Sequence, residues 1–206
     1  MPQTRHEILV KKHEQLNKTA LKGQIVFAGS SLMEDFPIAE MAQSLPGRPI
    51  VYNRGIGGDT IDGFSARLNS AVLDLEPRKL FINIGTNDIS APDYEREDML
   101  ARYRALLERI RTTLPETTIY VMSYYPVNRT EIFNTDWFRA RTNSEIDAVN
   151  ARLEKMAAEL GMEFMWVTDC LRDENGNLDA SLSLDGMHMY PDGYSRVLAL
   201  LAPLMN

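Results

Sequence analysis

The stretch Ile25-Val-Phe-Ala-Gly-Ser-Ser31 joins a short apolar run to a glycine and two serines. Its apolar part, Ile25–Ala28, has the length and composition of a strand that is buried on both faces. A helical pattern over Met33–Ser44 follows directly. A short buried strand followed by a helix is typical of a crossover to a parallel neighbour. The stretch therefore predicts the first strand of a parallel α/β sheet.

The same alternation continues through all 206 residues. Further strands are expected at Ile50–Asn53, Leu80–Ile84, Ile119–Ser123 and Phe164–Val167. Helical patterns cover Met33–Ser44, Thr60–Leu73, Tyr94–Thr113, Asn143–Leu160 and Pro191–Leu204, and a helix at about residues 2–20 precedes the first strand. The prediction is a single domain over residues 1–206, a three-layer α/β/α sandwich with a five-stranded parallel sheet of the flavodoxin-like kind.

Composition narrows the classes of partner. The chain is 44% hydrophobic and 25% charged, which is the usual balance of a globular domain. Its net charge of −7 argues against a nucleic-acid partner, which would call for a basic face. No apolar run approaches the length of a membrane span, and the first residues lack an apolar signal core. We expect a cytoplasmic protein; a secreted protein whose signal peptide has been removed is the alternative. A homodimer is as compatible with the sequence as a monomer.

The single cysteine, Cys170, excludes an intramolecular disulfide. It is either a nucleophile or, more simply, a small packed residue.

Ligands of such sheets bind at the carboxyl ends of the strands. Ser31 follows the first strand at the start of a helix, where free backbone N–H groups and the helix dipole would stabilise an alkoxide or an oxyanion. Helix capping by Ser30 or Ser31 is the simpler interpretation of these serines taken alone.

Asp185 and His188 are three residues apart, so the carboxylate can bond Nδ1 and leave Nε2 free. That arrangement fixes the tautomer of a general base and stabilises the imidazolium. The alternative is a surface turn with an incidental histidine. Because His6 and His13 lie in the polar first helix, a triad would have to use His188.

Two further positions could stabilise an oxyanion. Gly58 lacks a Cβ, so its backbone N–H can approach a ligand closely, although a tight turn also explains it. Asn87 has a side-chain NH₂ that can donate a hydrogen bond, although a turn residue would look the same. The glycines at 55–58 do not form a dinucleotide fingerprint, because the third glycine is missing and the stretch follows the second strand.

Together these segments resemble the four motif blocks of the SGNH (GDSL-like) hydrolases, across nearly the whole chain. The matching residues are Gly29-Ser30-Ser31, Asn53-x-Gly55-Ile56-Gly57-Gly58-Asp59, Gly85-Thr86-Asn87-Asp88 and Asp185-x-x-His188. Ser30 stands where the family often has aspartate, a form that some branches share. The Gly-Ile-Gly-Gly-Asp-Thr run looks like the platelet-activating-factor acetylhydrolase branch.

The resemblance implies a serine esterase acting on short, acetyl-type acyl groups of a small-molecule ester. Ser31 would be the nucleophile, His188 the base and Asp185 its partner. The oxyanion hole would comprise the N–H groups of Ser31 and Gly58 and the side chain of Asn87. The alternatives are a carbohydrate O-acetylesterase and a non-catalytic anion-binding module, which could use helix N-termini but has no need of Asp185 and His188.

No metal or other cofactor is expected, since no His-Glu-x-x-His spacing occurs. For the substrate wall we expect Tyr124, Tyr125 and Met187, with core packing as the alternative. We also expect four further side chains around the site: Trp137, Phe138, Met189 and Tyr190.

Overall fold

The computed structural model describes residues 3–130 and 137–206. Its five strands form one fully parallel sheet in the order β2-β1-β3-β4-β5. The strands are β1 (Ile25–Gly29), β2 (Val51–Asn53), β3 (Lys79–Asn83), β4 (Thr118–Met122) and β5 (Glu163–Met165). The predicted sheet is confirmed, with strand ends shifted by a residue or two. The strand order reverses between β1 and β3, and open α/β sheets bind ligands at such a switch point.

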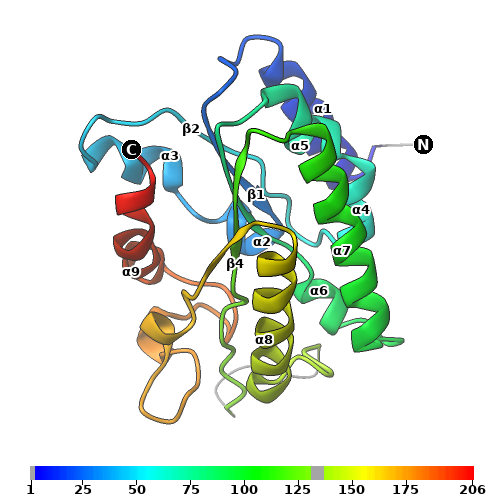
Figure 1. Cartoon of the computed structure of the whole chain (residues 1–206). Coiled ribbons are helices and arrows are strands. Elements are labelled where there is room, and N and C mark those ends of the chain that lie inside the picture. Colours follow the sequence, from blue (N-terminus) through cyan, green and yellow to red (C-terminus); the bar gives the residue numbers. More distant parts are fainter. Residues whose placement is uncertain (1–2, 131–136) are drawn as a thin grey trace.

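Helices cover both faces of the sheet (Figure 1). One side carries α1 (Arg5–Asn17), α4 (Ile61–Ala66), α5 (Leu68–Ala71), α7 (Arg96–Thr113) and α8 (Asn143–Glu159). On the opposite side lies α9 (Pro191–Leu201), followed by η5 (Ala202–Leu204). The result is the three-layer sandwich that the alternating pattern predicts.

The helix predicted over Met33–Ser44 is wrong in its continuity. The chain forms α2 (Ser31–Glu34), α3 (Ile38–Met41) and the 3₁₀ turn η1 (Ala42–Ser44). Pro37 interrupts the helix because it cannot donate a backbone hydrogen bond. The side-chain amide of Asn53 donates hydrogen bonds to backbone carbonyls at this break, to Met33 O at 2.6 Å and to Phe36 O at 2.9 Å.

The helix predicted over Thr60–Leu73 is also divided, into α4, α5 and the 3₁₀ turn η2 (Leu73–Leu75). Thr60 caps α4 by accepting a hydrogen bond from Gly63 N at 3.2 Å. The break falls at Arg67, whose buried guanidinium bonds to groups outside the helix.

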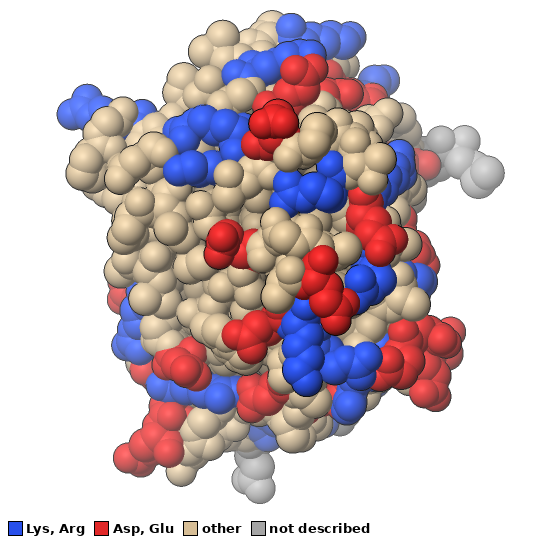
Figure 2. Space-filling model, viewed as in Figure 1, with Lys and Arg blue, Asp and Glu red and all other residues tan. Residues whose placement is uncertain are grey.

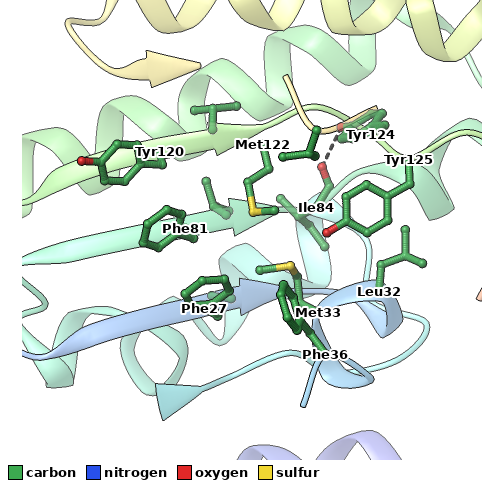
Figure 3. Close-up of a cluster of buried hydrophobic side chains, with 14 of the residues drawn as sticks. Phe27, Leu32, Met33, Phe36, Phe81, Ile84, Tyr120, Met122, Tyr124 and Tyr125 are labelled. Atoms are coloured by element: carbon green, nitrogen blue, oxygen red, sulfur yellow. Dashed lines mark hydrogen bonds between the residues drawn. The ribbon is translucent and has the colours of Figure 1, made fainter. Parts of the chain in front are cut away.

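Aromatic rings form a row across the middle of the sheet (Figure 3). Phe27, Phe81 and Tyr120 occupy the same register on β1, β3 and β4, and their rings stack at centroid distances of 4.6 Å. Phe36 meets Phe27 edge-on at 5.5 Å and stacks on Tyr194 of α9 at 4.8 Å. This packing holds β1 against α9 through Phe36, which lies two residues after the end of α2.

Figure 2 shows that positive and negative side chains are interspersed over the visible face, without a single basic field. Over the described residues, no helix is both long and apolar enough to cross a bilayer. The first helix, α1, begins with a capping box between Thr4 and Glu7 and buries His13. It is tied to the sheet through Asn17, whose Oδ1 accepts two hydrogen bonds from Arg54.

Candidate active site

Ser31 lies at the turn from β1 into α2. Ser30 has an extended backbone and makes no capping bond, and its buried hydroxyl has no partner in the described part of the chain. The hydroxyl of Ser31, in contrast, lies 2.9 Å from His188 Nε2. Helix capping therefore does not explain the second serine, and a hydroxyl–imidazole pair does.

The loop before α9 presents His188 to this hydroxyl. Asp185 Oδ2 lies 2.6 Å from His188 Nδ1. Its other oxygen accepts hydrogen bonds from the backbone N–H groups of Met187, at 3.0 Å, and His188, at 2.8 Å. Burial raises the pKa of Asp185, but the hydrogen bonds from His188 outweigh it and hold the pKa below the usual value. The carboxylate is thus ionised and orients the imidazole.

Two loops with N–H donors are connected to the Ser31 region: the Gly57–Gly58 turn packs against Ser31, and Asn87 bonds to Asp59, the residue after Gly58. A Cβ on Gly57 would stand 3.6 Å from Ser31 Cβ, so the Gly57–Gly58 turn lies next to the serine. Gly58 has a φ of +81°, which favours glycine, and its N–H, like that of Ser31, makes no hydrogen bond within the described residues. Asn87, in α6 (Thr86–Ile89), donates from Nδ2 to Asp59 O at 2.9 Å. One of its amide hydrogens remains for a ligand.

A buried arginine joins these loops. Arg67, 4% exposed, donates to Gly29 O at 3.0 Å, to Arg54 O at 2.9 Å and to Asp59 Oδ2 at 2.5 Å. Gly29 leads into Ser31, and Asp59 follows Gly58. Because Asp59 O also accepts the Asn87 amide, one ion pair connects all three loops that carry N–H donors.

Sequence reasoning missed Arg67. Two of its three partners are backbone carbonyls, which leave no trace in residue identity. The one usable signal was Asp59, an acidic residue inside an otherwise apolar and glycine-rich turn.

The expected substrate wall is only partly present. Tyr124 and Tyr125 are fully buried, and Tyr124 donates to Ile84 O at 2.6 Å (Figure 3). Their placement favours core packing over substrate contact. Met187 is also buried, whereas Trp137 is 43% exposed with its ring centroid 6.4 Å from that of His188. Of the other expected wall residues, Phe138 and Met189 are buried and Tyr190 is exposed.

Two other kinds of site were considered from the sequence, a cysteine nucleophile and a metal site. The Cys170 thiol donates to Val167 O at 3.2 Å, and burial raises its pKa, which disfavours the nucleophilic thiolate. Across residues 3–130 and 137–206, no cluster of three or more His, Cys, Asp or Glu side chains could hold a metal ion.

Comparison with known proteins gives this site a context. The model of the GDSL-like Lipase/Acylhydrolase family matches residues 29–196. The chain is 28% identical to a candidate platelet activating factor from Streptococcus pneumonia, with a TM-score of 0.88 over 98% of this chain and 92% of that one.

An acetylxylan esterase from Geobacillus stearothermophilus shares the fold, with 17% identity and a TM-score of 0.69 over 90% of this chain and 95% of its own. Among curated proteins, an N-acylneuraminate cytidylyltransferase from Escherichia coli O18:K1:H7 is 29% identical over 117 residues, or 56% of this chain. That match spans only 25% of the curated relative.

Proposed function

This chain belongs to the GDSL-like lipase/acylhydrolase family, and we propose that it is a serine esterase that cleaves small carboxylic esters through an acyl-enzyme. One observation carries the proposal: the unbroken hydrogen-bonded series from Ser31 through His188 to Asp185, at 2.9 and 2.6 Å. A module that only bound anions would not need a carboxylate to orient an imidazole against a serine.

In the acylation step, Ser31 Oγ attacks the ester carbonyl carbon while His188 Nε2 accepts the hydroxyl proton. Asp185 stabilises the imidazolium that forms. Collapse of the tetrahedral intermediate breaks the bond to the alcohol oxygen, and His188 returns the proton to that leaving group. Water then attacks the acyl-enzyme with His188 again as base, releasing the carboxylic acid and restoring Ser31.

The oxyanion of each intermediate is assigned to the N–H groups of Ser31 and Gly58 and to the Asn87 amide. Two observations support this assignment: these backbone N–H groups make no hydrogen bond to a residue that the structure describes, and Asn87 is held by a hydrogen bond to Asp59 O. Preorganised donors of this kind are commonly the largest contribution to catalysis of acyl transfer.

For the ester itself, short acyl groups of the acetyl type are the first candidate. A second candidate is an acetylated sugar, favoured by the names of two similar proteins, one an acetylxylan esterase and the other a transferase named for N-acylneuraminate. A panel of 4-nitrophenyl esters of rising acyl length, run beside acetylated sugars, ranks the two.

The decisive experiment measures ester hydrolysis and fluorophosphonate labelling of Ser31→Ala and His188→Ala. Each variant should lose nearly all turnover, and the double variant should be no worse than either single one, since the pair acts as a unit. Ser30→Ala is the matched control, one residue away, and should keep its activity and its label. Normal turnover by Ser31→Ala, or loss by Ser30→Ala, would overturn the assignment.

A further inference from the structure

Arg141 is a buried cation that lacks suitable acceptors. Its side chain is 1% exposed, and its Nε and Nη2 make no hydrogen bond to any residue that the structure describes. Within the described part of the chain, Nη1 alone has a partner, the thioether sulfur of Met187. A thioether is a weak acceptor, so this contact does little to offset the loss of hydration. Burial accordingly lowers the pKa of Arg141 to about 10.

The unpartnered nitrogens have a defined geometry. Nε and Nη2 lie along one edge of the planar guanidinium, and Nη1 lies on the other side. That edge presents two parallel N–H groups, which is the fork that binds a carboxylate or phosphate through two oxygens. The half of Arg141 suited to an oxyanion is therefore the half that no described residue contacts through a hydrogen bond.

Arg141 lies beside the proposed catalytic groups. Met187, which it contacts, immediately precedes His188. The Asp185 carboxylate is close enough for its charge to raise the pKa of Arg141, and the Tyr124 hydroxyl also lies near the guanidinium. Tyr124 in turn bonds to Ile84 O, just before the segment that carries Asn87. The guanidinium is thus close to both the catalytic loop and the β3–α6 turn.

We propose that Arg141 binds an anionic group of the substrate, so that the preferred substrates are esters carrying a carboxylate or phosphate near the scissile bond. This inference rests on the proposed esterase function. Met187 contacts Nη1, so the edge formed by Nε and Nη2 is left for the oxygen atoms of the substrate.

The first experiment compares hydrolysis of the three positional isomers of acetoxybenzoate with that of the uncharged acetoxybenzamides. Charge-assisted hydrogen bonds of this kind predict a preference for at least one charged isomer of about tenfold to a hundredfold in kcat/KM. Arg141→Met should reduce that ratio to near one by lowering kcat/KM for the charged isomer. Arg152→Met is the matched control, because it removes the same charge from an exposed ion pair with Glu97. It should keep the wild-type ratio.

Melting temperature separates this role from a structural one. Replacing an unpaired buried charge by an apolar side chain of similar length should leave the protein as stable or more stable. A lower melting temperature or failure to fold in Arg141→Met would mean that the cation supports the fold, and would overturn the proposal. Equal ratios in wild type and Arg141→Met would do the same.

Binding can be read without turnover. Benzoate and phosphate, at fixed ionic strength in chloride, should raise the melting temperature of the wild type but not that of Arg141→Met. The stronger of the two anions identifies the group that the fork binds. Protein that hydrolyses no ester yet shows this shift would count against the esterase assignment alone, whereas no shift with either anion would overturn the role of Arg141.

Discussion

Two buried arginines contact the segments that hold the Ser31–His188 pair, Arg67 through Gly29 and Arg141 through Met187, and their surroundings differ. Arg67 places all three of its nitrogens against oxygen acceptors, two of them backbone carbonyls and one the Asp59 carboxylate. Arg141 is as deeply buried, but one edge of its guanidinium has no acceptor among the described residues. Both give up hydration, and only Arg67 has protein groups that offset the cost.

The difference separates a structural cation from a binding one. Acceptors on three different segments make Arg67 a tie between the loops that carry the proposed oxyanion donors. The Nε and Nη2 edge of Arg141, in contrast, adds nothing to the stability of the fold, and we infer that it is there to bind a ligand. Substitutions at Arg67 and its contacts should therefore lower stability and turnover together. Substitutions at Arg141 should instead alter the preference for charged over uncharged esters.

Arg67→Met should have the largest effect. It leaves the buried Asp59 carboxylate without its cation, and breaking a buried pair in this way costs about 3–5 kcal/mol. Chemical denaturation of the variant measures the loss directly. Arg141→Met, the matched change on the other side, should show no loss. Equal destabilisation by the two substitutions would remove the distinction between them.

Asn87→Ala tests whether the loops connected by Arg67 hold an oxyanion donor. Removing one oxyanion donor should lower kcat by about 10²–10³, or roughly 3–4 kcal/mol, with little change in KM. The reason is that the amide bonds strongly only to the charged intermediate. Steady-state kinetics and melting temperature are measured on one preparation. A normal kcat with a lowered melting temperature would identify Asn87 as a turn residue instead.

The pKa of His13, which is near Arg67, predicts how the free energy of unfolding changes with pH. Burial, aided by the charges of Arg54 and Arg67, lowers the pKa of His13 to about 3. Between that value and the ordinary histidine value of about 6.5, the unfolded chain binds a proton that the folded chain does not. Stability should therefore fall as pH drops through this window, by up to about 1.4 kcal/mol per pH unit.

Urea midpoints of wild type and His13→Leu between pH 4 and 7 check this. The slope with pH should be shallower in the variant. Parallel slopes would show that His13 takes up its proton in the folded state as readily as in the unfolded chain.

Met187→Leu should have the smallest effect. The substitution conserves volume, so the free energy of unfolding should change by less than about 1.5 kcal/mol. It removes only a weak sulfur acceptor from Arg141, so the preference for charged esters should persist within about twofold, since such acceptors contribute little. A collapse of that preference would mean that Met187, rather than Arg141, selects the substrate.

The sequence by itself determined the alternation of strands and helices, because buried parallel strands must be short and apolar. It also singled out the strand-end segments that hold Ser31, Gly58, Asn87 and Asp185–His188. Local chemistry carried this much, since an Asp three residues before a His can bond to it within one loop.

The broken helices were only partly readable from sequence. Pro37 marks the first break by its own chemistry. The break at Arg67 has no local cause, because that side chain is drawn to carbonyls on other segments.

Only the tertiary structure shows that the Ser31 hydroxyl lies within hydrogen-bond distance of His188, a residue 157 positions away. It also decided that Tyr124 and Tyr125 turn into the core, and that Arg67 finds acceptors for its nitrogens whereas Nε and Nη2 of Arg141 find none among the described residues. The physical reason is common to all of these. Backbone acceptors are alike at every residue, so which of them surrounds a buried side chain is fixed by the packing of distant segments and not by the identity of its neighbours in sequence.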